Sequence, residues 1–162
     1  MNFTFHKDFS ELDLAEWNIL LSESISNAPF LRHEYLNAWW GTRGGGEWPG
    51  AELVLLSAFE DNHLVGIAPL FKAEYDGGQT LLLLGSIEIS DYLDLIVRAD
   101  DLSRFLSGLL DFCASDPAVA CPRFDWYNLP KDSPTLTALE AESAKRGWSF
   151  TSEPFRPSLY VP

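Results

Sequence analysis

Basic residues are scarce in this chain. Its 162 residues include 11 Lys and Arg against 24 Asp and Glu, which gives a formal net charge of −13 at pH 7. A nucleic-acid-binding protein needs clustered cations to displace the counterions of the phosphate backbone. A peripheral membrane protein needs them to dock on anionic lipid. The composition therefore argues against both nucleic acid and membrane surfaces as partners.

Long apolar runs and cysteines are also few. No run approaches the ~20 apolar residues that span a bilayer, and the start, MNFTFHKDFSELD, lacks the basic and then apolar pattern of a secretion signal. We therefore expect no membrane span and a cytoplasmic location. In that compartment Cys113 and Cys121 are expected to be free thiols, with a disulfide between them as the alternative.

Residue patterns that bind metals or nucleotides are missing as well. The two cysteines form no CxxC pair, and His6, His33 and His63 are not spaced as ligands, so each is expected at the surface or in a turn. The glycine-rich stretch GTRGGGEWPG (41–50) lacks the Gly-Lys-Ser/Thr of a P-loop and is expected to be a surface loop. No GxSxG nucleophile motif is present.

Apolar and aromatic residues, in contrast, are plentiful. Hydrophobic residues make up 46% of the chain, aromatic residues 14% and charged residues 22%, with six Trp. This is a globular composition, and 162 residues suffice for one domain with a core but hardly for two. We therefore expect a single domain over residues 1–162.

The spacing of apolar residues predicts four helices and seven strands. The helices are Leu14–Ser24, Leu31–Trp40, Asp101–Ser115 and Pro134–Arg146, the last with an N-cap serine, an N1 proline and a C′ glycine. The strands are Asn2–His6, Leu53–Phe59, Leu64–Tyr75, Thr80–Leu84, Arg123–Leu129, Trp148–Ser152 and Ser158–Val161. Pro69 predicts a bulge or an unpaired position within its strand, because proline donates no ladder hydrogen bond.

The resulting order, β-α-α-β-β-β-α-β-α-β-β, predicts an α/β or α+β fold in which helices flank a mixed central sheet. This order is similar to that of the GNAT acyltransferases. Three stretches carry a closer resemblance: PFLRHEYLNAWW (29–40), LVLLSAFEDNHLVGIAPLF (53–71) and LLLLGSIEISDYLDLIV (81–97). They look like the first half of a tandem-GNAT protein of the Fem type, and most closely like the bacterial acetyltransferases linked to cellulose biosynthesis.

That resemblance, which covers the chain from about Trp17 to its end, implies that two domains have different roles. In the tandem proteins the second GNAT domain holds the acyl donor and the catalytic machinery, and the first shapes the acceptor groove. This chain would then be the N-terminal half. Its partners would be the missing C-terminal GNAT domain and a small-molecule, peptide or sugar acceptor.

The segment that would hold the cofactor departs from the GNAT pattern. A working GNAT domain grips the pyrophosphate of acyl-CoA with an (Arg/Gln)-x-x-Gly-x-(Gly/Ala) turn at a helix N-terminus. The matching stretch here, LIVRADDLS (95–103), has no glycine, and Arg98 is a lone cation beside Asp100 and Asp101. Two carboxylates at a helix N-terminus repel a pyrophosphate. We therefore expect no cofactor site in this chain and expect acetyl-CoA or another acyl-CoA to bind the full-length protein.

The candidate substrate-binding residues lie in the loop GSIEISDYLDL (85–95) and on the second helix. Ser90, Asp91, Tyr92 and Asp94 follow a strand end and could bind a sugar or peptide acceptor; alternatively, Ser90 and Asp91 form a turn and Tyr92 packs in the core. Trp39 and Trp40 point in different directions on a helix. One is expected in the core, and Trp40 is taken as the one that faces a ligand or the missing half.

Three functions remain open from the sequence. The first is a GNAT-like domain of a bacterial N-acyltransferase that acts on a cell-envelope or polysaccharide-related acceptor and is not catalytic alone. The second is a stand-alone GNAT N-acetyltransferase with a divergent cofactor loop. The third is a non-catalytic binding or scaffold domain that forms a homodimer. The sequence does not identify a general base.

Overall fold

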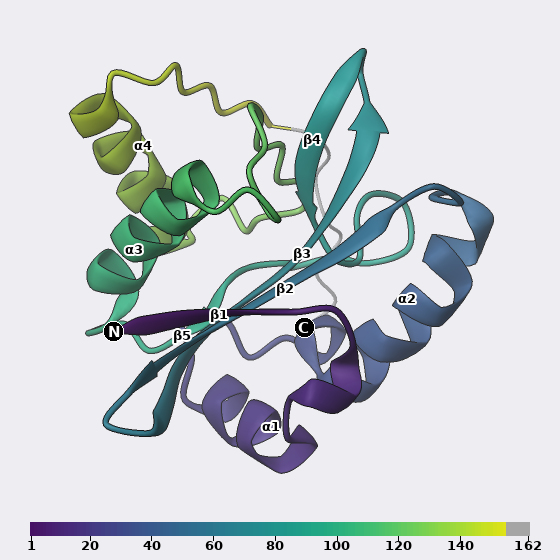
Figure 1. Ribbon diagram of the computed structural model, residues 1–162, viewed down its shortest axis with the longest axis horizontal. Coiled ribbons are helices and arrows are strands. Elements are labelled where there is room, and N and C mark those ends of the chain that lie inside the picture. The colour runs from purple at the N-terminus through teal and green to yellow at the C-terminus, as the bar shows by residue number, and fades with distance from the viewer. Residues whose placement is uncertain (155–162) are drawn as a thin grey trace.

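An antiparallel sheet forms the centre of the protein (Figure 1). The computed structural model describes residues 1–154, and within them the sheet has five strands. Four are neighbours in chain order and the fifth also pairs with β3: β1 (Asn2–His6), β2 (Glu52–Glu60), β3 (His63–Tyr75), β4 (Gly78–Leu83) and β5 (Ile96–Val97). The two tight hairpins that join β2, β3 and β4 hold their turn residues at positive φ, as the favoured two-residue turns require.

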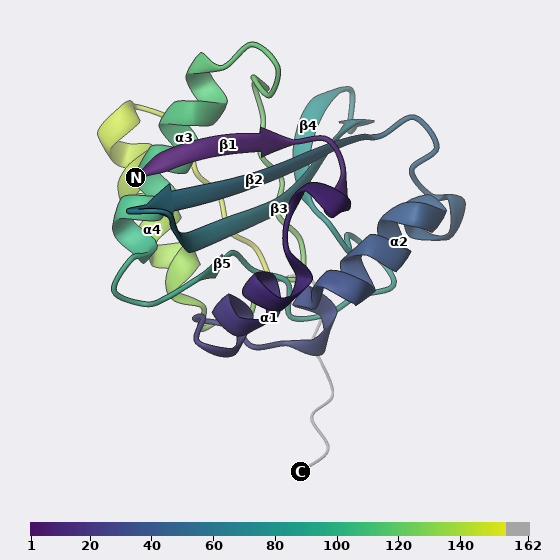
Figure 2. The ribbon, with the colours of Figure 1, turned by 60° about the horizontal axis from the view of Figure 1, so that its bottom comes forward.

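Helices cover both faces of this sheet (Figures 1 and 2). On one face lie α1 (Leu14–Ser22) and α2 (His33–Gly46), preceded by the 3-10 turns η1 (Phe9–Glu11) and η2 (Pro29–Leu31). On the other face lie α3 (Leu102–Ser115) and α4 (Pro134–Arg146). No helix within residues 1–154 is long and apolar enough to cross a membrane.

The α3 face of the sheet is built around close aromatic packing. The Phe3 ring of β1 stacks on Phe105 of α3 with 5.5 Å between ring centroids. A Cβ placed on Gly66 of β3 would lie 2.3 Å from the Phe105 ring. Glycine at position 66 therefore makes room for the ring that fixes α3 on the sheet.

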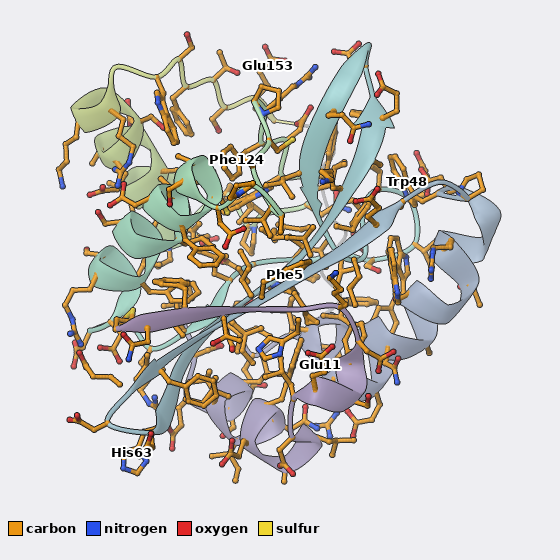
Figure 3. The ribbon with its side chains drawn as sticks, in the orientation of Figure 1. Phe5, Glu11, Trp48, His63, Phe124 and Glu153 are labelled. Carbon is orange, nitrogen blue, oxygen red and sulfur yellow. The ribbon has the colours of Figure 1, made fainter. Side chains whose placement is uncertain are left out.

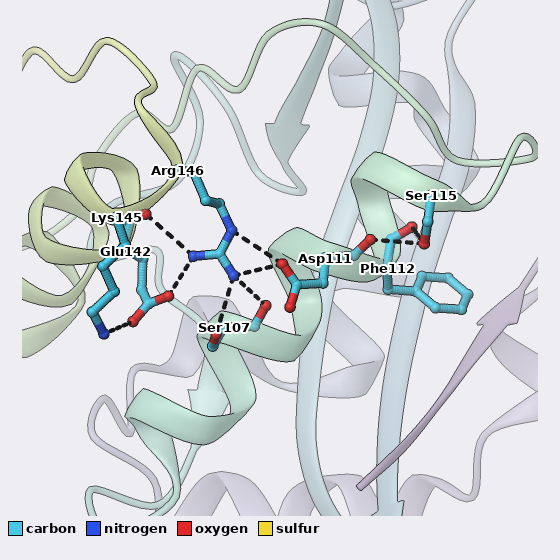
Figure 4. A network of polar contacts seen from close by, with 7 residues as sticks. All are labelled: Ser107, Asp111, Phe112, Ser115, Glu142, Lys145 and Arg146. Atoms are coloured by element: carbon cyan, nitrogen blue, oxygen red, sulfur yellow. Dashed lines mark hydrogen bonds and ion pairs between the residues drawn. The ribbon is translucent and has the colours of Figure 1, made fainter.

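A polar network joins α4 to α3 (Figure 4). The Arg146 guanidinium contacts Asp111 Oδ1 at 2.6 Å and the Ser107 backbone oxygen at 3.0 Å, and it pairs with the Glu142 carboxylate on its own helix. Hydrogen bonds from Lys145 and Arg146 lower the pKa of Glu142 to about 2. Glu142 is buried, and these two cations stabilise its ionised form.

The most unusual feature of the sheet is an interruption beside β3. Leu83 of β4 pairs with Leu70, and Ile96 of β5 pairs with Ile67. These two pairs are three residues apart along β3 but thirteen residues apart along the segment that pairs with it. Ten extra residues are therefore inserted in that segment. We call residues 85–94 the interrupting loop, because β4 and β5 are two pieces of one strand that this loop separates.

Pro69 lies at the interruption. Its carbonyl accepts a hydrogen bond from the Leu84 N–H at 2.8 Å, and its nitrogen faces the same side of the strand. The missing N–H therefore falls where the neighbouring strand leaves the sheet, which confirms an unpaired position. The bulge of this hairpin lies elsewhere, at Val65 of β3, which has no partner between the pairs Ala58–Gly66 and Phe59–Leu64.

The α+β fold class with a helix-flanked sheet is confirmed, but the strand pairs are antiparallel rather than mixed. Three helices agree with the prediction to within two residues. The fourth, α2, continues six residues past the predicted end at Trp40, so the first part of the predicted surface loop belongs to it, with a left-handed backbone at Arg43, Gly44 and Gly45. Two predicted strands are wrong. Over Arg123–Leu129 there is a single parallel bridge, from Phe124 to Leu81, and Trp148–Ser152 forms no strand. The strand predicted at Ser158–Val161 lies outside the described residues. Among residues 1–154 the order therefore has β5 before α3 and no strand between α3 and α4.

Candidate functional site

The inner side of the interrupting loop is fixed by two residues that are distant in the sequence. The Ser90 hydroxyl and the Tyr35 hydroxyl of α2 are 2.7 Å apart. The Asn128 side-chain amide donates to the carbonyls of Ile87 at 2.7 Å and Ser90 at 2.6 Å, and its backbone carbonyl accepts from the Leu93 N–H at 3.0 Å. The loop therefore has a defined shape.

Trp48 and Gly85 fix the start of the loop. The indole N–H of Trp48 donates to the Ser86 carbonyl at 2.9 Å. Gly85 has a φ of 102°, which only glycine adopts readily. A Cβ at this position would lie 2.8 Å from the Leu93 side chain, so the two ends of the loop meet closely here.

Asp94 is an internal anchor of the fold. Its side chain is 1% exposed and accepts hydrogen bonds from the hydroxyls of Ser133 and Thr135, both at 2.6 Å, and from the Leu95 N–H at 2.8 Å. Burial raises the pKa of Asp94, and these three hydrogen bonds oppose the rise. The Asp94 carboxylate is therefore buried and bound to neighbouring groups of the fold. In this structure it is not available to a substrate, contrary to the prediction from the sequence.

The tip of the loop faces solvent. Glu88, Ile89, Asp91 and Tyr92 are exposed, with Ile89 at 53% and Tyr92 at 41%. Tyr92 has a φ of 55°, a conformation that costs a non-glycine residue energy and that clusters at functional sites. Of the predicted loop residues, Asp91 and Tyr92 are therefore available to a ligand, whereas Ser90 is buried and bonded to Tyr35.

A second carboxylate lies next to the loop. Glu47, at the end of α2, accepts a hydrogen bond from the Ile87 backbone, and desolvation by its surroundings together with the charge of Glu88 raises its pKa. The exposed rim thus combines carboxylates with apolar and aromatic side chains. This chemistry suits an acceptor that carries an amine or hydroxyl groups.

Trp40 belongs to a different place. Trp39 is buried in the core, and Trp40 lines a groove of about 570 Å³ together with Phe5, Lys7 and Arg43. Neither Asp91 nor Tyr92 lines that groove. The five predicted site residues are therefore divided among the loop tip, the loop interior and this groove.

Ion pairs surround the N-terminus of α3. Asp101, at the N-cap position, makes no side-chain cap and instead contacts Arg104 Nη2 at 2.7 Å, while Arg104 also reaches Glu60 at 2.9 Å. Arg98 is bound by Glu23 at 2.6 Å. Both nearby guanidinium groups are thus already paired with carboxylates, and the Asp101 carboxylate lies at the helix end that would otherwise attract an anion.

A serine, a histidine and a carboxylate meet beneath the sheet but cannot act on a substrate. His6 Nε2 lies 2.7 Å from the Ser57 hydroxyl, and His6 Nδ1 lies 3.4 Å from Glu11 Oε2; Figure 3 marks Glu11 beside β1. This order of groups is that of an activated nucleophile. Ser57, however, has no solvent exposure, so no acyl group can reach it.

His6 and His33 are buried, at 7% and 6% exposure, which corrects the expectation of surface or turn positions; His63 does lie at the β2–β3 turn. Cys113 and Cys121 are free thiols. Burial raises the pKa of Cys113 to about 12, so it is an unreactive core residue. Across residues 1–154, no group of three or more His, Cys, Asp and Glu residues is arranged to hold a metal ion.

Sequence reasoning missed the residues that shape the loop. Tyr35 lies within an apolar helical stripe, and Asn128 lies within a stretch that alternates like a strand. Neither position signals a contact with a loop some 40 to 55 residues away. The one local signal is the asparagine itself, which tolerates its φ of 62° better than most residues.

Two solved structures resemble this fold. An acetyltransferase from Trypanosoma brucei matches with a TM-score of 0.53 and 17% identity, over 98% of this chain and 99% of that one. The glucosamine-6-phosphate N-acetyltransferase of Arabidopsis thaliana matches with a TM-score of 0.47 and 11% identity over both full chains. No protein-family model matches this chain, and no curated protein matches its sequence. The match to the Trypanosoma brucei acetyltransferase shows a GNAT-like fold.

Proposed function

We propose that this chain is the acceptor-binding, GNAT-like half of an acyltransferase of the bacterial Fem or cellulose-biosynthesis type. A second GNAT domain would hold acyl-CoA and supply the general base. The acceptor would be a small molecule, peptide or sugar of the cell envelope that presents an amine or a hydroxyl. Acyl transfer would then require both halves.

The charged groups around the N-terminus of α3 carry this proposal. In a GNAT domain that binds its own donor, this helix terminus must offer backbone N–H groups to a doubly charged pyrophosphate. Here Asp101 occupies the terminus, and the nearby guanidinium groups of Arg98 and Arg104 are bound to carboxylates. A net charge of −13 adds long-range repulsion of the same anion.

The interrupting loop supports the acceptor role. It leaves the sheet beside Pro69, at a break in the strand, and its interior contacts hold it in one shape. Its exposed Asp91 and Tyr92 can donate, accept and stack, as sugar and peptide acceptors require. A rigid loop that presents polar and aromatic groups at a strand break is a suitable binding element.

A thioester assay tests the proposal. The chain is incubated with acetyl-CoA and, in turn, lysine, glucosamine and a lysine-containing tripeptide, and the released CoA thiol is measured. The expected rate equals that of a blank without protein. Release above the blank that depends on the acceptor would show that the chain is an enzyme by itself and would contradict the proposal.

A further inference from the structure

The first residues of β2 extend past the end of β1 and have no partner strand on that side. The last pair of the β1–β2 ladder is His6 with Leu55, so Glu52, Leu53 and Val54 extend beyond the end of β1. Figure 2 shows β1 turning away while β2 continues toward α2. This edge lies on the outer side of the sheet, since β1 is the terminal strand.

The ladder geometry tells which backbone groups face this edge. The Leu84 N–H donates to the Pro69 carbonyl, so the backbone groups of Pro69 point toward β4. Its partner in β2, Leu55, must then point away from β3 and toward β1. Leu53, two residues earlier, points the same way, and its N–H and C=O have no strand opposite them.

The edge runs along the groove that contains Trp40. Phe5 and Lys7 from the end of β1, Trp40 and Arg43 from α2, and Glu52 and Leu53 from β2 line this groove; Phe5 is marked in Figure 3. Its volume of about 570 Å³ lies within the range of binding sites for small ligands.

The cations of the groove are unusual for this protein. Seven of the ten Lys and Arg residues within positions 1–154 form an ion pair with a carboxylate. The three without such a pair are Lys7, Arg43 and Lys131, and the first two line this groove. Arg43 lies 3.6 Å above the Trp40 ring and donates to the Trp40 carbonyl, which holds its guanidinium at the groove.

The carboxylates at the same rim are already engaged. Asp8 accepts a hydrogen bond from the Ser10 N–H at 2.8 Å, and Glu52 pairs with Lys72 at 3.4 Å. Two cations without carboxylate partners therefore line the groove, against one carboxylate, Asp8, that pairs with no cation among residues 1–154. Despite the acidic chain, the local chemistry of the groove favours an anionic group.

We propose that this groove binds a short extended peptide segment that carries a carboxylate. The peptide backbone would pair with the N–H and C=O of Leu53 and extend the sheet past β1. The carboxylate would contact Lys7 and Arg43 through charge-assisted hydrogen bonds. It could be the C-terminus of the peptide or an Asp or Glu side chain, since both have the same chemistry.

Nuclear magnetic resonance titration of the whole chain tests this proposal. The probes are acetyl-Ala-Val-Ala with a free C-terminus, the same peptide with a C-terminal amide, acetyl-Ala-Val-Glu amide, and acetate. The free-acid peptide or the Glu peptide, or both, is expected to bind with a dissociation constant on the order of 1 mM or lower. Binding should shift the Leu53 amide resonance and slow its hydrogen exchange. The comparison of the two acidic peptides identifies the source of the carboxylate.

Matched variants separate the groove from general charge effects. Lys7→Gln and Arg43→Gln are each expected to weaken peptide binding about ten-fold, whereas Lys131→Gln, at an exposed cation outside the groove, should not change it. Within residues 1–154 the Lys7 side chain makes no hydrogen bond or ion pair and approaches only the Phe5 ring. Lys7→Gln is therefore a valid test even if Arg43→Gln unfolds the chain. Equal binding by wild type and Lys7→Gln, equal binding of acetate and peptide, or an unchanged Leu53 amide would overturn the proposal.

Discussion

The carboxylate of Asp94 and the hydroxyl of Thr135 are joined by a hydrogen bond of 2.6 Å, 41 residues apart in the sequence. Together with the Ser133 hydroxyl, this contact ties the end of the interrupting loop to the start of α4. Asp94, one of the two acidic loop residues predicted to bind a substrate, is therefore a structural residue. Its neighbours at the tip remain available to an acceptor.

Replacement of Asp94 should therefore affect stability, and replacement of Asp91 should not. Asp94→Ala leaves two buried hydroxyls without their acceptor, and the free energy of unfolding is expected to fall by about 2–3 kcal/mol. Asp91→Ala, at an exposed position, is expected to change it by less than about 0.5 kcal/mol. Urea unfolding of both variants gives the comparison. Equal effects would mean that Asp94 does not anchor α4.

Asn128 is expected to control the order of the loop. Asn128→Gly keeps the left-handed backbone but removes the two side-chain hydrogen bonds to Ile87 and Ser90. Stability should fall by about 1–2 kcal/mol, and amide hydrogen exchange should quicken within residues 85–94 before it does in β2 or β3. Uniformly faster exchange over the whole sheet would show that the loop is not a separate unit.

Glu142 should make the protein sensitive to acid. Hydrogen bonds from Lys145 and Arg146 lower its pKa from 4.5 to about 2. Because the folded state holds the carboxylate ionised, its stabilisation is fully present above about pH 4.5 and is lost as the pH falls toward 2. Unfolding measured from pH 2 to 7 should therefore show a smaller acid-side loss in Glu142→Gln than in wild type.

The matched control is Glu140→Gln, at an exposed position on the same helix. It should retain the wild-type slope of stability against pH. If Glu140→Gln flattens that slope as much as Glu142→Gln does, the effect comes from net charge on α4 rather than from the pairs with Lys145 and Arg146.

Gly66 is expected to be far less replaceable than Gly78, although both lie in strands. A Cβ at Gly66 would overlap the Phe105 ring, whereas a Cβ at Gly78 meets nothing within 4 Å. Gly66→Ala should lower stability by about 2–3 kcal/mol because α3 must move off the sheet. Gly78→Ala should be close to neutral. Melting temperatures of the two variants decide this, and a neutral Gly66→Ala would contradict the packing described here.

Local signals made the helices and hairpins predictable. Ser133 caps α4 through the Thr135 N–H, and Gly147 ends the helix at a φ of 67°, so both boundaries follow from neighbouring residues. The same holds for the hairpin turn at Asp61 and Asn62, whose residues favour positive φ.

Nonlocal contacts account for the errors. The stretch Arg123–Leu129 alternates like a strand, but only Leu81 offers it a partner, and Asn128 at a φ of 62° ends the extended conformation. A strand needs a neighbour as well as a pattern, and the sequence does not show which neighbour is present. For the site, the sequence left open whether Tyr92 is exposed or packed in the core. The burial of Asp94 depends on hydroxyls at the start of a helix 39 to 41 residues away.

Calorimetric titration of the chain with acetyl-CoA is the most direct test of the proposal that this domain does not bind the acyl donor. If Asp101 and the carboxylate-bound guanidinium groups of Arg98 and Arg104 keep a pyrophosphate from the N-terminus of α3, no saturable heat should appear up to millimolar acetyl-CoA. Saturable binding with a micromolar dissociation constant, weakened by substitution of Arg98 or Arg104, would show that this chain holds the donor itself and would contradict the proposal.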